Sequence, residues 1–106
     1  MTQGIRAVAV ILMAASLAGL SFAQAPGADT YKKCVACHGA DGLATSTMAK
    51  NMKVLSFKDP AMLKASDAQF IASTTNGKGA HMPPYKDKLT SAQIKDVVAY
   101  IRTLQK

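Results

Sequence analysis

The sequence predicts an all-α fold, and three observations lead to this class. No stretch of the chain alternates apolar and polar residues in the way that a half-buried strand requires. Two capping boxes, one opened by Ser66 and the other by Thr90, mark helix starts. The segment after Thr90 then carries apolar residues at helical spacing along one stripe, namely Ile94, Val97, Val98, Ile101 and Leu104.

The first 23 residues have the features of a cleaved secretory signal peptide. Arg6 supplies positive charge, residues 7–20 form a mostly apolar run, and small residues precede a cut between Ala23 and Gln24. The run is shorter than the roughly 20 apolar residues that span a bilayer. We therefore expect residues 1–23 to be removed and the protein to be periplasmic, without stable membrane insertion.

Residues 24–106 are predicted to form one domain, which is small for an unaided hydrophobic core. In this part of the chain 11 lysines and one arginine face six aspartates, which gives a net charge of +6 with histidine neutral. Such a charge favours partners with acidic surfaces. The lysines are scattered and no nucleic-acid-binding motif accompanies them, so we expect no nucleic acid to bind. A monomer is expected.

The first helix of this domain is predicted to begin near Asp29, which should cap its first turn, and to end at Gly39. It carries Cys34 and Cys37, followed directly by His38. Helical residues three apart share a face, so both sulfurs can reach the two vinyl groups of one porphyrin. The next residue can then bring an imidazole nitrogen to the iron. Cys-x-x-Cys-His is the attachment motif of a c-type haem, and it predicts one covalent haem c.

Three other interpretations of these cysteines carry less weight. A disulfide would close almost no loop and would stabilise the fold little. A thioredoxin-like redox site needs a βαβ context, which the sequence lacks. A zinc site could recruit Cys34, Cys37, His38 and His81, but the adjacent Cys37 and His38 are poorly placed to share one tetrahedron.

After a turn at Asp41-Gly42, the next segment carries a weaker helical pattern. Met48, Met52 and Leu55 lie at i, i+4 and i+7, on one face of a short helix. A second short helix should start with Asp59 as its cap and Pro60 as its first residue, and it carries Met62 and Leu63.

The two capping boxes open the remaining helices. The helix after Ser66 should bury Phe70 and Ile71 and end at Asn76-Gly77. The helix after Thr90 should pack its apolar stripe inward.

The loop between these helices offers two candidates for the second axial ligand of the iron. Met82 precedes a proline, which favours an extended backbone, and Pro83 and Pro84 stiffen the segment. In an extended stretch His81 and Met82 point to opposite sides, so only one of them can bind. We expect Met82 to be the ligand and His81 to lie outside, in solvent.

Four segments together resemble the small soluble monohaem class I cytochromes c. They are Cys34-Val-Ala-Cys-His38-Gly39-Ala-Asp-Gly42, Asn76-Gly77-Lys-Gly79, Met82-Pro83-Pro-Tyr85 and Val98-Ala-Tyr100-Ile101. The resemblance implies three main helices, with short helical turns, around one haem. It also implies that Gly27 and Tyr31 meet Tyr100 where the first and last helices cross, and that His38 and Met82 bind the iron.

These observations predict a one-electron carrier, not an enzyme. With both axial positions filled, the iron changes oxidation state without binding a substrate, and methionine ligation raises its potential. Lys78, Lys86 and Lys88 flank the methionine loop and are candidates for the docking rim. The alternative is a haem protein with a labile sixth ligand, acting as a small peroxidase or gas sensor, with His81 as its distal residue. A non-haem metal-binding module is a third hypothesis.

Overall fold

The computed structural model describes residues 26–106, and the predicted signal peptide lies outside these residues. The chain forms α1 (Ala28–Tyr31), η2 (Lys32–Cys34), α2 (Val35–His38), α3 (Thr47–Asn51), α4 (Pro60–Lys64), α5 (Asp67–Asn76) and α6 (Ser91–Leu104). The described residues contain no strand, only one isolated bridge between Lys78 and Met82. The predicted all-α class is confirmed.

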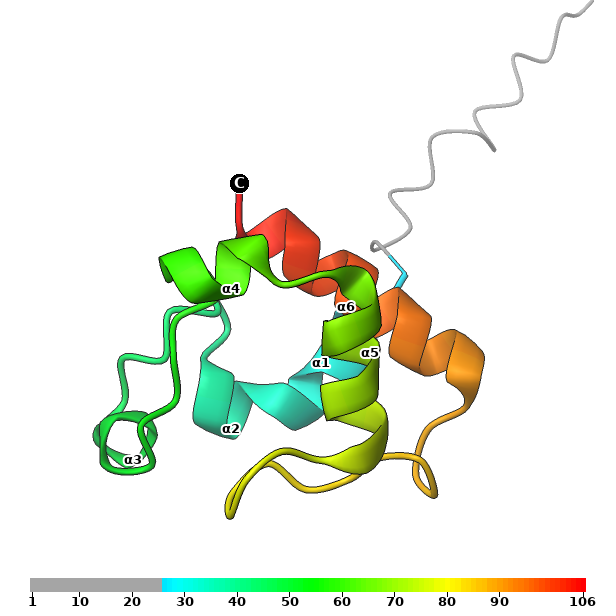
Figure 1. Cartoon of the computed structure of the whole chain (residues 1–106), viewed down its shortest axis with the longest axis horizontal. Coiled ribbons are helices and arrows are strands. Elements are labelled where there is room, and N and C mark those ends of the chain that lie inside the picture. Colours follow the sequence, from blue (N-terminus) through cyan, green and yellow to red (C-terminus); the bar gives the residue numbers. More distant parts are fainter. Residues whose placement is uncertain (1–25) are drawn as a thin grey trace, which may run out of the picture.

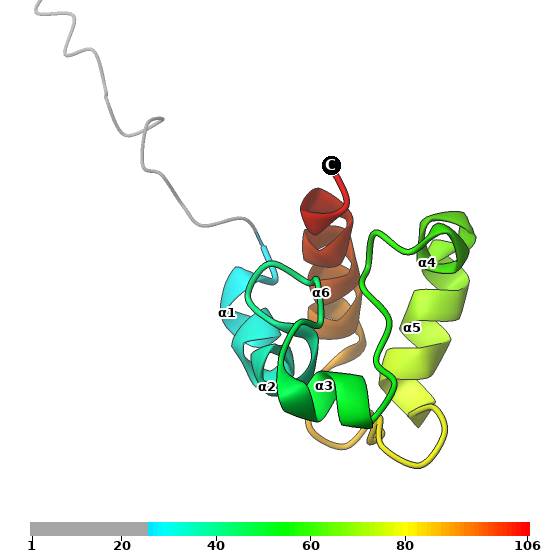
Figure 2. The same cartoon turned by 90° about the vertical axis from the view of Figure 1, so that its left-hand side faces the viewer.

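The helix α6 runs along one side of the ring of helices in Figure 1 and lies between the other helices in Figure 2. In Figure 2 it stands upright, with α1 and α2 on one side and α4 and α5 on the other. Both α1 and α5 pack directly against it. The core combines Tyr31, Phe57, Phe70, Val97, Val98 and Ile101. The predicted stripe of α6 is confirmed, since four of its five residues are buried and Leu104 packs against the core.

The first and last helices cross closely, as the resemblance implies. A Cβ at Gly27 would collide with the backbone carbonyl of Asp96, and the φ of Gly27 is +91°. Only glycine fits this approach without strain. The rings of Tyr31 and Tyr100 lie 5.2 Å apart at the same crossing.

Most predicted helix boundaries are confirmed. Ser66 and Thr90 each form a complete capping box, Asp59 caps α4 with Pro60 behind it, and Gly39 ends α2 at a φ of +83°. The predicted role of Asp29 is wrong. The residue before α1 is Gly27, which has no side chain to accept a hydrogen bond, and Asp29 lies one position inside the helix and pairs with Lys32.

The apolar stripe predicted around α3 is not a buried one. Met48 is 45% exposed and Leu55 is 49% exposed. Met52 and Leu55 both border the cavity described below, and Met48 does not. Leu63 on α4 is also 49% exposed. The predicted helix through Leu55 is wrong, because α3 ends at Asn51 and Lys53 has a φ of +57°, so Leu55 lies in the following loop and not on the same helix face.

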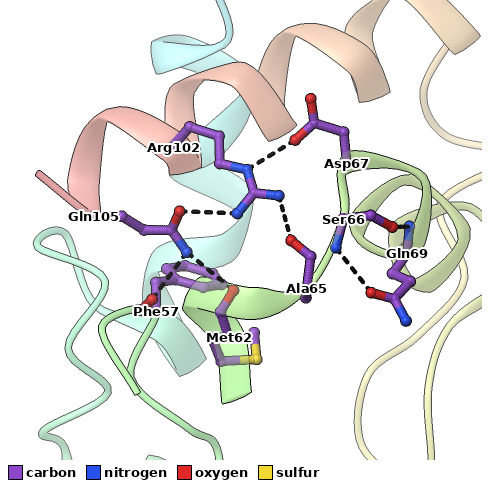
Figure 3. A network of polar contacts seen from close by, with 8 residues as sticks. All are labelled: Phe57, Met62, Ala65, Ser66, Asp67, Gln69, Arg102 and Gln105. Atoms are coloured by element: carbon purple, nitrogen blue, oxygen red, sulfur yellow. Dashed lines mark hydrogen bonds and ion pairs between the residues drawn. The ribbon is translucent and has the colours of Figure 1, made fainter. Parts of the chain in front are cut away.

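A network of hydrogen bonds connects the end of α6 to the start of α5 (Figure 3). The guanidinium of Arg102 donates to Asp67 Oδ1 at 2.8 Å, to the Ala65 carbonyl at 2.6 Å and to Gln105 Oε1 at 3.0 Å. It also lies over the Phe70 ring, 4.5 Å from its centroid. Gln105 Nε2 in turn donates to the Phe57 carbonyl at 2.9 Å. The network therefore holds Phe57 and the α4–α5 junction against α6.

Candidate functional site

The predicted site residues lie around one partly open cavity of about 340 Å³. η2 and α2 contribute Cys34, Cys37 and His38 to its lining, and the loop after α5 contributes Met82. Much of the remaining lining is apolar and includes Met52, Val54, Leu55, Phe57, Met62, Phe70, Val97 and Ile101. Lys53 and Lys78 are the cationic side chains that border it among the described residues. Residues far apart in sequence thus share one apolar cavity.

The two cysteines are free thiols, with no disulfide between them. Burial, and then the neighbouring Cys37, raise the pKa of Cys34 against a smaller lowering by Lys33. Cys34 is therefore a protonated thiol near neutral pH. Within residues 26–106, no group of three or more histidine, cysteine or acidic side chains is arranged to hold a metal ion.

His38 is held in an apolar setting. Desolvation by burial lowers the pKa of its imidazole, so the ring is neutral near pH 7 and keeps a lone pair for a metal ion. Its ring stacks on that of Phe57, with centroids 4.7 Å apart and planes 13° from parallel. Nδ1 is buried and has no hydrogen-bond partner among the described residues. Leaving this nitrogen unsatisfied costs about 1–3 kcal/mol.

The methionine loop is anchored to the end of α5 by backbone hydrogen bonds. Lys78 and Met82 exchange two of them, at 3.0 and 3.3 Å, and the amide of Tyr85 donates to the Thr74 carbonyl at 2.9 Å. Gly77, with a φ of +77°, makes this closure possible, because a Cβ there would lie 2.6 Å from the Met82 carbonyl oxygen. Met82 is half-buried in the cavity lining.

The predicted extended backbone at His81 is wrong. Residues 79–81 form a turn, closed by the pairing of Lys78 with Met82. His81 is exposed, as expected, and it also borders the cavity. The turn follows from Gly79, whose φ of +62° reverses the chain before Met82.

Sequence reasoning missed two residues of this site. Phe57 was not among the predicted site residues, and its contact with His38 joins positions 19 residues apart in the sequence. Gly42 was recognised only as a turn residue. A Cβ there would lie 2.7 Å from Cδ2 of Phe57, so the glycine also makes room for that ring. A glycine shortly after the motif was the only signal in the sequence for this packing.

The residues present fit a covalently attached haem. Two thiols three positions apart, a neutral imidazole with an unsatisfied nitrogen, and a thioether all border one apolar cavity. Thioether and imidazole are the axial ligands found in cytochromes c.

Comparison with known proteins agrees with this chemistry. Residues 22–101 match the family described as cytochrome C oxidase, cbb3-type, subunit III. A cytochrome c6 of Nostoc sp. is 34% identical over 95 residues, covering 89% of this chain and 82% of the relative. A cytochrome c6 of Leptolyngbya boryana is 34% identical over 82 residues, covering 74% and 88%.

Two further proteins match this chain, and the share of their own length that the match covers differs widely. The cytochrome c subunit of a quinone alcohol dehydrogenase from Gluconacetobacter polyoxogenes is 34% identical over 94 residues, and the match spans 82% of this chain but only 20% of that subunit. The solved structure of the c-type cytochrome KustC0563 superimposes with a TM-score of 0.69 at 30% identity, covering 76% of this chain and 98% of the other. The fold, the cavity and these relatives together show that the chain belongs to the cytochrome c family, as a small monohaem cytochrome with covalently bound haem c.

Proposed function

We propose that the protein is a periplasmic one-electron carrier in which Cys34 and Cys37 attach the haem and His38 and Met82 are the axial ligands. The observation that carries this proposal is the cavity that all four side chains border. When bound, the haem supplies a one-electron couple at its iron.

The chain's own residues attach and orient this group. Cys34 and Cys37 would hold the haem through thioether bonds. Each thiol would add across one vinyl group, with its sulfur on one vinyl carbon, its hydrogen on the other, and no leaving group. The neutral ring of His38 offers a nitrogen lone pair from a desolvated position in the cavity lining. Met82 offers a soft sulfur from a backbone that is already hydrogen-bonded in place, so little entropy remains to be lost on binding.

The anchored loop favours a carrier over a haem with a labile sixth ligand. A peroxidase or gas sensor needs an open iron position and an acid–base side chain beside it. His81 borders the cavity, but it is exposed and sits on the turn that presents Met82. The cytochrome c6 relatives also support the carrier.

The optical spectrum of the protein made with a haem-attachment system tests the ligand assignment. We expect a reduced spectrum that carbon monoxide does not change and, in the oxidised form, the weak far-red band of a sulfur–iron bond. Met82→Ala should lose that band and bind carbon monoxide readily, because its sixth position is open. His81→Ala is the control and should behave as the parent protein. Carbon monoxide binding by the parent protein would refute the Met82 assignment.

We also propose that partners dock at the lysines of the methionine loop. Lys78 borders the cavity, and Lys86 and Lys88 are exposed a few residues after Met82, with Lys88 over the Tyr85 ring. The rate of oxidation by the anionic reagent hexacyanoferrate(III) should fall as salt rises from 0.01 to 0.1 M, since the screening length falls from about 30 Å to about 10 Å. Glutamine at all three positions should flatten this dependence, and Lys95→Gln on α6 should not. An unchanged salt dependence in the triple variant would place docking elsewhere.

The periplasmic location rests on the predicted signal peptide. Among residues 26–106, no helix has the length and apolar character needed to cross a membrane. The mass of the protein recovered from the periplasm should equal that of residues 24–106 plus one haem. A mass that retains residues 1–23 would contradict the proposed cleavage.

A further inference from the structure

The contact between Phe57 and His38 has a consequence for the orientation of the imidazole. The two rings are nearly parallel, 13° apart, with their centroids separated by 4.7 Å. Phe57 is only 3% exposed, so its ring face is available to this neighbour and not to solvent. The pair is therefore a stack of nearly parallel rings, in which Phe57 is buried and His38 is half-buried.

Covalent geometry does not set the plane of a histidine ring. Rotation about the bond from Cβ to the ring is a broad torsion, so neighbouring contacts decide the angle. In metal-binding histidines the second ring nitrogen usually donates a hydrogen bond that fixes the ring. Nδ1 of His38 has no such partner among the described residues. The contact that remains to set the ring plane is the stack on Phe57.

Phe57 itself is held on several sides and can act as the fixed partner. Its amide donates to the Gly42 carbonyl at 2.9 Å, and its carbonyl accepts from Gln105 Nε2 at 2.9 Å. Its ring meets the edge of Phe70, with centroids 6.1 Å apart and planes at 70°. On another side the ring lies so close to Gly42 that a Cβ on this residue would be 2.7 Å from Phe57 Cδ2, so the ring cannot move in that direction. Figure 3 shows Phe57 and Gln105 within the network that ties α6 to this region.

We propose that Phe57 is a positioning residue that fixes the plane of the His38 imidazole, and thereby the direction of the ligand's π orbitals at the iron. The proposal rests on the proposed function, because it takes His38 as an axial ligand. A fixed plane keeps the ligand in one orientation in both oxidation states, which suits a carrier that must not rearrange on each electron transfer.

The test is the ferric protein with Phe57→Leu, which removes the flat ring face and keeps an apolar side chain of similar reach. The chemical shifts of the four haem methyl resonances should become more alike in the proton NMR spectrum. The imidazole then samples several orientations, so the unequal spin distribution that one fixed ring plane imposes on the haem averages out. The EPR signal of the frozen protein should broaden for the same reason. Phe57→Tyr retains a flat ring and should restore the methyl pattern of the parent protein.

Two further variants separate positioning from packing. Val98→Ala truncates a buried side chain of the same core that does not line the cavity, so it should lower stability and leave the methyl pattern unchanged. Gly42→Ala keeps the Phe57 ring and displaces it, so it should alter the pattern. An unchanged pattern in Phe57→Leu and Gly42→Ala, with the far-red band retained, would overturn the role of Phe57 and leave the ligands standing. A parent protein without the far-red band would instead refute the proposed ligation.

Discussion

The double variant Cys34→Ala, Cys37→Ala is expected to retain no haem after denaturation and to be largely unfolded at room temperature. Without attachment the cavity of about 340 Å³ loses its filling. At roughly 24 cal/mol per Å³ an unfilled apolar cavity of this size costs on the order of 8 kcal/mol. This equals the whole stability of many domains, which is about 5–15 kcal/mol. The cavity is partly open, so water entry lowers this cost without restoring the lost contacts.

Haem staining of a denaturing gel and a far-ultraviolet circular dichroism melt measure the two parts of this expectation. Ala36→Ser is the matched control, since it changes an exposed residue between the cysteines and leaves both thiols in place. It should keep its haem and melt cooperatively. A double variant that melts cooperatively without haem would show that the apolar core alone supports the fold.

The second large effect is expected from Gly77→Ala, which should detach Met82 from the iron without touching the methionine itself. The new Cβ would lie 2.6 Å from the Met82 carbonyl oxygen and 3.0 Å from the Pro84 nitrogen, and these are backbone atoms that cannot move aside cheaply. The φ of +77° and ψ of 172° also belong to a region that only glycine occupies readily, at a cost of about 1–3 kcal/mol for other residues. The loop should therefore open, with loss of the far-red band and binding of carbon monoxide.

The loop provides its own control for this prediction. Gly79 also has a positive φ, +62°, but a Cβ there would meet nothing within 4 Å. Gly79→Ala should therefore cost only about 1–2 kcal/mol of left-handed strain and keep the far-red band. If both variants lose the band equally, backbone strain and not the collision with Met82 is responsible, and the positioning role of Gly77 is wrong.

The sequence by itself was sufficient for features whose cause is local. A capping box needs only Ser66 and Gln69, or Thr90 and Gln93, because both hydrogen bonds close within three residues. The haem motif needs only Cys34, Cys37 and His38, because one helical turn places both sulfurs on one face. The stripe of α6 follows from helical periodicity, and the charge of the domain follows from composition.

The tertiary structure alone decided the contacts that join distant parts of the chain. Sequence periodicity could not show that Met48 and Leu55 are exposed, because burial depends on whether another element covers a helix face. It could not show that the carbonyl of Ala65 accepts a hydrogen bond from Arg102, or that the absence of a side chain at Gly77 makes room for the Met82 backbone. Nor could it predict the contact between the Phe57 and His38 rings. The segment between the two residues can adopt many conformations, and the packing of α6 against this region selects the one in which the rings meet. Local hydrogen bonds and helical geometry are encoded within a few residues, whereas the shape of the haem cavity depends on how the whole chain packs.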